Sequence, residues 1–325
     1  MATVSGLNSW AAGLIAMLLA LAYSWLLLRL VPAGTNQSLI QTAMGYSLPG
    51  GAGLGLILVF FFITVAVVYL RDFINLMNLF LPRTPSLIFA LTLIFLGAYA
   101  IKLGLETLVR VSTLLVIPVL LLVSVGIFPG FFTQDHQFPL LMLEEWRSLL
   151  HGVIIQGSVF GEVLIITVLL PFTQKSGRSF WFIAIPFGIA WGIISLMTYA
   201  LYSNFNNLSP QLSYKLLCLY QNIGRIGSLF LILWITTFLI KVTIFLYGTI
   251  QGLSQVFKLS RAEPLILPTA LLIGVLSLVS FDNHIDYNLF IIYNFPLFSL
   301  AVQSGIPLMF QALKLVAAPS TANNP

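Results

Sequence analysis

Long uninterrupted apolar runs dominate this sequence, and they restrict the possible folds more than any other feature. The runs are about 20 residues long, the length that an α-helix needs to cross the hydrocarbon core of a bilayer. Only 7% of the residues are charged, against roughly 25% in an average soluble domain. This small number of polar groups could not cover the surface of a soluble fold. Lipid must therefore be the main solvent. Continuous runs also favour helices over a β-barrel, whose strands alternate apolar and polar residues.

About nine apolar segments follow one another, and each is expected to form a helix of an all-α membrane protein. They lie near residues 9–31, 53–81, 86–102, 106–129, 150–172, 180–202, 227–251, 264–281 and 288–313. Neither a linker nor a shift in composition divides the chain, so we expect one membrane domain over residues 1–325. Residues 317–325 are small and polar and are expected to form a disordered tail.

The charges are scattered between the apolar runs, although their sum is +5. A nucleic-acid partner would require a basic cluster, so none is expected. The single cysteine, Cys218, excludes an internal disulfide, and three dispersed histidines give no metal-binding pattern. No glycine-rich phosphate loop and no nucleophile beside a base are present, so an enzyme is the weakest interpretation. We expect no catalytic residue, no metal and no cofactor.

Lysine and arginine counts on alternate sides of the segments predict the orientation in the membrane. The side of the N-terminus has five of them. The opposite side has eight, namely Arg29, Lys102, Arg110, Lys175, Arg178, Lys258, Arg261 and Lys314. Because lysine and arginine are enriched on the cytoplasmic side of a membrane, the side with eight is expected to be cytoplasmic. The N-terminus then lies outside and the C-terminus lies in the cytoplasm. The first 28 residues contain neither lysine nor arginine, so they lack the basic start of a secretory signal peptide.

Three ionisable residues, Lys102, Glu106 and Arg110, stand where the third and fourth segments meet, at spacing i, i+4 and i+8. On one continuous helix they would form a ladder of alternating charge along one face. An ionisable group costs at least about 2.5 kcal/mol at the centre of a membrane helix, so each needs a partner or a task. The three form either a structural ion network or a hinge or gate between the two helices.

Two further ionisable residues, Glu162 and Lys241, lie near the middle of their apolar segments. Either they form an ion pair that only joins two helices, or they serve ligand binding or the coupling of protons or ions. The residues just before the carboxylate are Gly157, Ser158, Val159, Phe160 and Gly161. Such a stretch unwinds easily, and unwound helices in mid-membrane hold small substrates with their backbone amides. Close packing against a neighbouring helix is the alternative explanation of the glycines.

Several short tracts occur in an order that is similar to one known family. They span residues 82–85, 104–110, 157–172, 233–248 and 263–268. The third combines a small-residue break, an acid, an apolar run and Pro-Phe, and the fourth has Lys241 at its centre. This ordered set resembles the endospore germination permeases, a family of the amino acid–polyamine–organocation superfamily.

That resemblance implies a fold of ten helices in two inverted repeats, with the first and sixth helices unwound around the substrate. Aligned by the shared tracts, the segment near 150–172 is similar to the family's sixth helix. The family's first helix would then have no counterpart, and the chain would present only one of the two broken helices.

The resemblance also implies a role, that of a nutrient-sensing receptor subunit in the spore's inner membrane. It would bind a small, amino acid-like germinant and act with two other receptor subunits to trigger germination. The backbone from Gly157 to Gly161 would then cradle the germinant, and Glu162 would fix the break or pair with a cation. The Lys241 ammonium would stand where sodium-coupled relatives hold an ion.

Two other functions stay open on the sequence. A secondary transporter that moves an amino acid together with a proton would share the fold and the site and differ only in turnover. A truncated remnant without signalling activity, or a purely structural partner in a receptor complex, is the other possibility.

Overall fold

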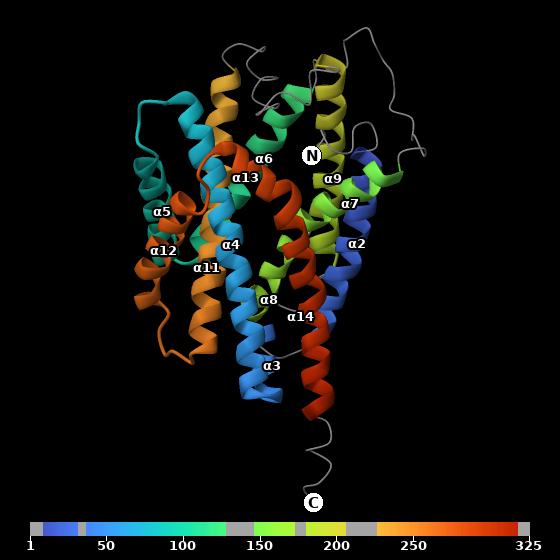
Figure 1. Cartoon of the computed structure of the whole chain (residues 1–325), viewed down its shortest axis with the longest axis vertical. Coiled ribbons are helices and arrows are strands. Elements are labelled where there is room, and N and C mark those ends of the chain that lie inside the picture. The colour runs from blue at the N-terminus through green and yellow to red at the C-terminus, as the bar shows by residue number, and fades with distance from the viewer. Residues whose placement is uncertain (1–8, 32–36, 128–145, 173–179, 206–225, 318–325) are drawn as a thin grey trace, which may run out of the picture. The chain divides into compact units, whose positions relative to one another are not determined.

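A computed structural model describes residues 9–31, 37–127, 146–172, 180–205 and 226–317, and all regular secondary structure in these ranges is helical. The longer α-helices, labelled in Figure 1, are α2 (Ser9–Leu30), α3 (Leu39–Tyr46), α4 (Leu48–Phe80), α5 (Ser86–Lys102), α6 (Leu105–Ile127), α7 (Trp146–Phe160), α9 (Trp181–Phe205), α11 (Ile226–Val256), α12 (Ile266–Val279) and α14 (Phe295–Ala317). Shorter elements complete the set, namely the 3₁₀ turns η4 (Gly161–Ile165), η5 (Leu170–Phe172) and η7 (Glu263–Leu265), the helices α8 (Ile166–Leu169) and α13 (His284–Leu289), and the π-helical turn η8 (Phe290–Asn294).

Seven helical stretches of the described chain are long and apolar enough to cross a bilayer, and two shorter apolar helices, Ser86–Lys102 and Glu263–Val279, accompany them. Each apolar segment expected from the sequence falls on one of these stretches. The prediction of an all-α membrane fold is therefore confirmed. The ten-helix inverted repeat stays a prediction.

The chain groups into two compact units that alternate along the sequence. The first unit consists of Met1–Ala22, Val109–Phe160 and Phe180–Thr236. The second consists of Tyr23–Leu108, Gly161–Ser179 and Thr237–Pro325. The single domain expected over residues 1–325 stays a prediction. Several expectations concern positions outside the described residues, namely His136, Cys218, the basic residues Lys175, Arg178, Lys215 and Arg225, and the tail at 318–325.

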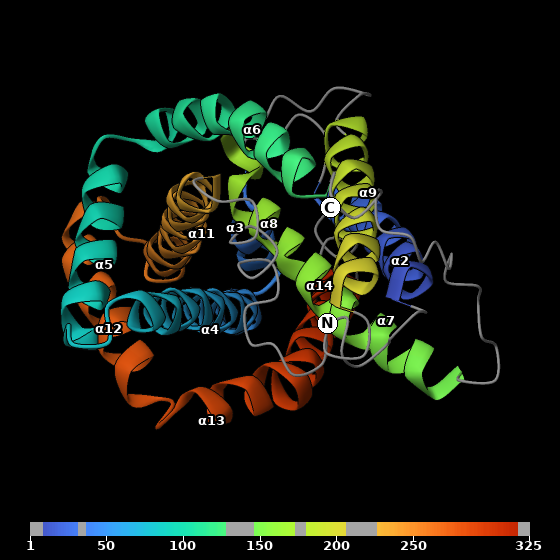
Figure 2. The ribbon, with the colours of Figure 1, turned by 90° about the horizontal axis from the view of Figure 1, so that it is seen from above.

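Helix α4 is the centre of the second unit. It contacts α3, α5, α12 and α14, and Figure 2 shows α5 and α12 beside one of its ends. Its side chains Leu58, Phe61, Phe62 and Ile74 are fully buried. Close packing of these large side chains fixes the position of α4, so polar groups on α4 are held in fixed positions as well.

The start of α4 differs from the expected segment, which began only at residue 53. Ser47 caps the helix and accepts a hydrogen bond from the Gly50 N–H at 3.4 Å, and Pro49 occupies the first turn. Proline fits there because the first helical N–H groups have no partner within the helix. The Gly50-Gly51 pair, which precedes the expected segment, therefore lies inside α4.

Replacing Gly51 by alanine is expected to lower the stability of the protein by about 1–3 kcal/mol. A β-carbon at this position would overlap the backbone of Ala43 and Met44 in α3, and backbone cannot move aside as a side chain can. Thermal unfolding of the purified protein in detergent measures the loss. Gly45→Ala is the control, because a β-carbon there meets nothing within 4 Å. Equal midpoints for the two variants would contradict the close approach of α3 and α4.

The link between α5 and α6 corrects one expectation. Lys102 ends α5, Gly104 adopts φ 96°, and Glu106 is the second residue of α6. Because a left-handed backbone conformation interrupts the helix, the three charges do not stand on one continuous helix as the ladder required. Only Glu106 and Arg110 share a helix. A role of the three residues as an ion network or a gate stays a prediction.

Candidate functional site

A group of polar side chains lies near the middle of the membrane-spanning helices of the second unit. Lys241 stands at the centre of α11, and Glu162 is the second residue of η4. The structure brings them together, with Lys241 Nζ 3.2 Å from Glu162 Oε2. Tyr69 of α4 completes a closed triangle, since its hydroxyl donates to Glu162 Oε1 and accepts from Lys241 Nζ at 2.5 Å.

The two charged residues of this triangle differ in exposure, and further aromatic and acidic side chains lie beside them. The Glu162 side chain is 14% exposed, whereas that of Lys241 is 41% exposed. The Tyr69 ring stacks on Phe245 of α11, with centroids 6.5 Å apart. Asp72, one turn further along α4, interacts electrostatically with Lys241 and Tyr69. Two carboxylates and one ammonium leave one negative charge when all are ionised, so the cluster can accept a proton or a cation.

The change in helix geometry before Glu162 lies later than the sequence suggested. Residues 157–160 remain α-helical as the end of α7, and the backbone tightens to a 3₁₀ helix at Gly161. Ser158 Oγ donates to the Ile155 carbonyl at 2.7 Å, a bond within α7 that does not require an open helix. The unwound stretch expected over residues 157–161 is therefore replaced by a 3₁₀ turn that follows it. Ligand binding by Gly157, Ser158, Val159, Phe160 and Gly161 stays a prediction.

Gly161 lies against the side chain of Gln303 in α14. A β-carbon at this position would overlap the side-chain amide of Gln303. That amide is held in place, because Gln303 Nε2 donates to Ser299 Oγ at 2.9 Å, one turn earlier on the same helix. Polar groups from α4, η4, α11 and α14 thus meet around residues 161 and 162.

Sequence reasoning missed Asp72 and two uncharged members of this group, Tyr69 and Gln303. Both are uncharged polar residues within long apolar helices, and a search for ionisable residues in apolar segments passes over them. A search for every hydrogen-bonding side chain near the centre of a span would have included both. Their pairing with Glu162 and Gly161 depends on how distant helices pack, and no local pattern encodes it.

Comparison with known proteins gives a consistent result. The sequence model of a family described as spore germination protein matches residues 1–285. Spore germination protein KB of Bacillus subtilis (strain 168) is 27% identical over 252 residues, which cover 71% of this chain and 66% of that protein. A second protein of the same organism, YfkT, has a provisional spore germination name and is 25% identical over 275 residues, or 79% of this chain and 73% of that protein. The chain thus spans just under two thirds of the first relative.

Proposed function

Since this chain belongs to the spore germination permease family, we propose that it is the nutrient-sensing subunit of a germinant receptor and that it binds an amino acid-like germinant within the membrane. Its family and the seven long apolar helices in the described part of the chain make it an integral membrane protein related to spore germination. Sensing of a nutrient is the further step, and the polar cluster around Lys241 and Glu162 is the observation that supports it.

The cluster offers complementary charges to both ends of an amino acid. The Lys241 ammonium can pair with the carboxylate of the germinant, and Glu162 or Asp72 can pair with its amine. A zwitterion that enters would exchange the present Lys241–Glu162 contact for two new ones. Because Lys241 is the more exposed member of the pair, we expect it to meet the germinant first. The 3₁₀ turn at Gly161 and the Gln303 amide supply neighbouring hydrogen-bonding groups.

In this proposal the protein lies in the spore's inner membrane, with its N-terminus outside and its C-terminus in the cytoplasm. It acts with two other subunits of the germinant receptor, and binding of the germinant shifts the cluster between a self-paired and a ligand-paired state. Such a shift is a local exchange of ion pairs that packed helices can convert into movement.

The charge balance of the cluster also favours a second candidate, a secondary transporter that moves an amino acid with a proton. Glu162 pairs with Lys241, and Asp72 is a second carboxylate one turn from Tyr69 on α4, so one carboxylate is available to take up and release a proton. Uptake of labelled amino acid into vesicles that is lost in Glu162→Gln would favour this candidate. Binding without uptake would favour the receptor.

Deletion of the gene in its spore-forming host tests the proposed receptor. Spores that lack the protein are expected to lose germination in response to one nutrient of a panel of single amino acids and sugars. The wild-type copy should restore that response, and a Glu162→Gln copy produced at the same level should not. Germination rates that are unchanged for every nutrient of the panel would count against sensing.

A further inference from the structure

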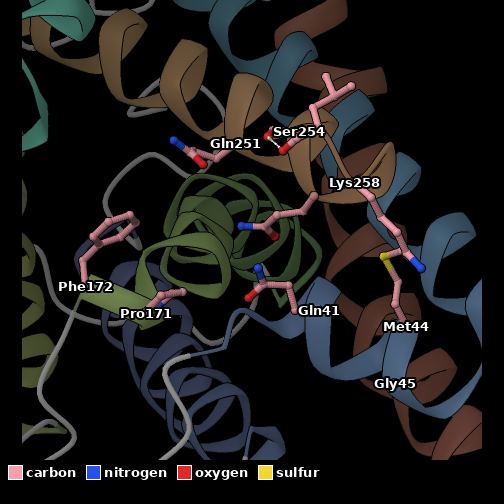
Figure 3. Close-up of a pocket in the computed structure, with 10 residues that line it drawn as sticks. Gln41, Met44, Gly45, Pro171, Phe172, Gln251, Ser254 and Lys258 are labelled. Atoms are coloured by element: carbon pink, nitrogen blue, oxygen red, sulfur yellow. Dashed lines mark hydrogen bonds between the residues drawn. The ribbon is translucent and has the colours of Figure 1, made fainter. Parts of the chain in front are cut away.

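A pocket of about 620 Å³ lies at one end of the second unit, well away from the polar cluster. Residues of α3, η5 and the C-terminal end of α11 line it. About 15 Å of helix separates Lys241 from Gln251, the first residue of α11 that lines the pocket. Figure 3 shows Gln41 and Gln251 on opposite sides of the pocket, with Phe172 at one end and Lys258 near Met44 at the other. This pocket has no part in the proposed binding of the germinant.

The hydrogen bonds around Ser38 engage two glutamine amides that line the pocket. The Ser38 N–H donates to Gln41 Oε1 at 3.0 Å, and Ser38 Oγ donates to Gln255 Oε1 at 2.5 Å. Ser38 Oγ also accepts from the Gln41 N–H at 3.2 Å, which uses a lone pair and leaves the hydroxyl hydrogen for Gln255. Both carboxamide oxygens are thus occupied by donors. Since a backbone N–H can only donate, the orientation of the Gln41 amide is fixed, and its NH₂ group is left for the pocket.

Lys258 stands in a backbone conformation that normally selects glycine. Its φ is 51°, and it follows the end of α11 in a motif where the Leu259 N–H bonds the Ser254 carbonyl at 2.9 Å and the Lys258 N–H bonds the Gln255 carbonyl at 3.2 Å. Glycine, or less often asparagine, occupies this position in most helices that end this way. A lysine held here against its backbone preference adds a positive charge to the lining of the pocket that Gln41 and Gln255 also line, and such strain is often retained at binding sites.

The chemistry of the lining suits an anion with an apolar part. Among the described residues that form the pocket, none is aspartate or glutamate, and the polar side chains present a cation and several N–H donors. Phe172 and Leu259 are 61% and 43% exposed at the same place. The pocket also lies near the start of the apolar helix α4 and the end of the apolar helix α11. Lipid headgroups lie at the ends of membrane-spanning helices.

We propose that this pocket binds the phosphate group of an anionic phospholipid. Lys258 and the amides of Gln41 and Gln255 hold the phosphate, and the acyl chains run along the exposed Phe172 and Leu259. Lys258 belongs to the side of the chain that the charge counts assign to the cytoplasm. That leaflet carries the anionic lipids that attract basic residues.

The test uses the purified full chain in nanodiscs of phosphatidylcholine, with or without phosphatidylglycerol, and thermal unfolding as the measurement. Phosphatidylglycerol is expected to raise the unfolding midpoint of the wild type. Lys258→Gly should weaken this lipid's apparent affinity about tenfold. The same variant should unfold no earlier than the wild type in pure phosphatidylcholine, because glycine relieves the backbone strain. Asparagine tolerates the same backbone conformation, so Lys258→Asn should behave like Lys258→Gly in both measurements.

Lys314→Gln is the matched control, because it removes one positive charge from the last turn of α14 without touching the pocket. It should retain the response to phosphatidylglycerol. Equal responses of the wild type and Lys258→Gly would overturn the proposal. Stabilisation by inorganic phosphate in pure phosphatidylcholine, lost in Lys258→Gly and without a further gain from phosphatidylglycerol, would instead assign the pocket to a soluble phosphate ligand and overturn the lipid.

Discussion

Replacing Lys241 by methionine is expected to destabilise the protein by about 2 kcal/mol and to abolish its response to the germinant. Methionine keeps the length of the side chain but leaves Glu162, whose side chain is 14% exposed, without its cation. Removing one partner of a fully buried pair costs about 3–5 kcal/mol. The cost is smaller here because Lys241 is 41% exposed and solvent weakens its attraction to the carboxylate. Thermal unfolding in detergent and germination of complemented spores measure the two effects.

The double variant Glu162→Gln/Lys241→Met separates stability from function. With both charges removed, the free energy of unfolding should return to within about 1 kcal/mol of the wild type, because no uncompensated charge remains. The response should stay lost, since the groups that pair with the germinant are gone. Lys314→Met provides the control for loss of a lysine, because this exposed side chain should change stability by no more than about 0.5 kcal/mol. A stable Lys241→Met protein would argue that the pair contributes nothing to the fold.

Much of the fold could be predicted because the dominant physical constraint is local. A helix in lipid must be long, apolar and internally hydrogen-bonded, so each span leaves a continuous record in the sequence. The same logic identified Glu162 and Lys241, since a charge inside such a run is costly and therefore conspicuous. Their contact was one of the possibilities that the sequence left open, and only the structure brings them to 3.2 Å.

The errors arose where local geometry depends on single residues. Gly104 follows Lys102 closely enough to end α5, and a glycine just after a basic last turn is a known sign of a helix end. The expected segments 86–102 and 106–129 already lay on either side of this glycine, so the structure excludes only the ladder along one continuous helix. By contrast, the close approach of Gln303 to Gly161 joins residues that lie far apart in the sequence. The sequence alone could not distinguish a glycine that opens a helix from one that admits a neighbour.

Tyr69 shows a further limit of the sequence. It stands in α4 among apolar residues, and in a membrane helix a tyrosine is as common at an interface as in a site. Its role as the third member of the cluster follows from the depth at which α4 crosses α11 and η4. Likewise, the pocket at Lys258 is assembled from α3, η5 and α11, which no sequence pattern places together.

Replacing Gly161 by leucine is expected to abolish the response to the germinant and to lower stability by about 3 kcal/mol. Even a β-carbon at this position overlaps the Gln303 amide, and the hydrogen bond from Gln303 to Ser299 resists its displacement. The added side chain would therefore push η4 away from α14 and carry Glu162 away from Lys241. Binding of labelled germinant to the purified protein and thermal unfolding provide the two measurements.

Residue 161 can be glycine because it packs closely against a neighbouring helix or because it binds the ligand. A control variant and a second substitution distinguish these two explanations. Gly305→Leu lies on α14 itself, where a β-carbon meets nothing within 4 Å, so it should leave both measurements near the wild-type values. Adding Gln303→Ala to Gly161→Leu removes the overlapped amide and should restore most of the stability. If binding stays lost in the restored protein, the polar groups beside Gly161 contact the germinant. If binding returns with stability, Gly161 serves packing alone, and the germinant site must be sought elsewhere.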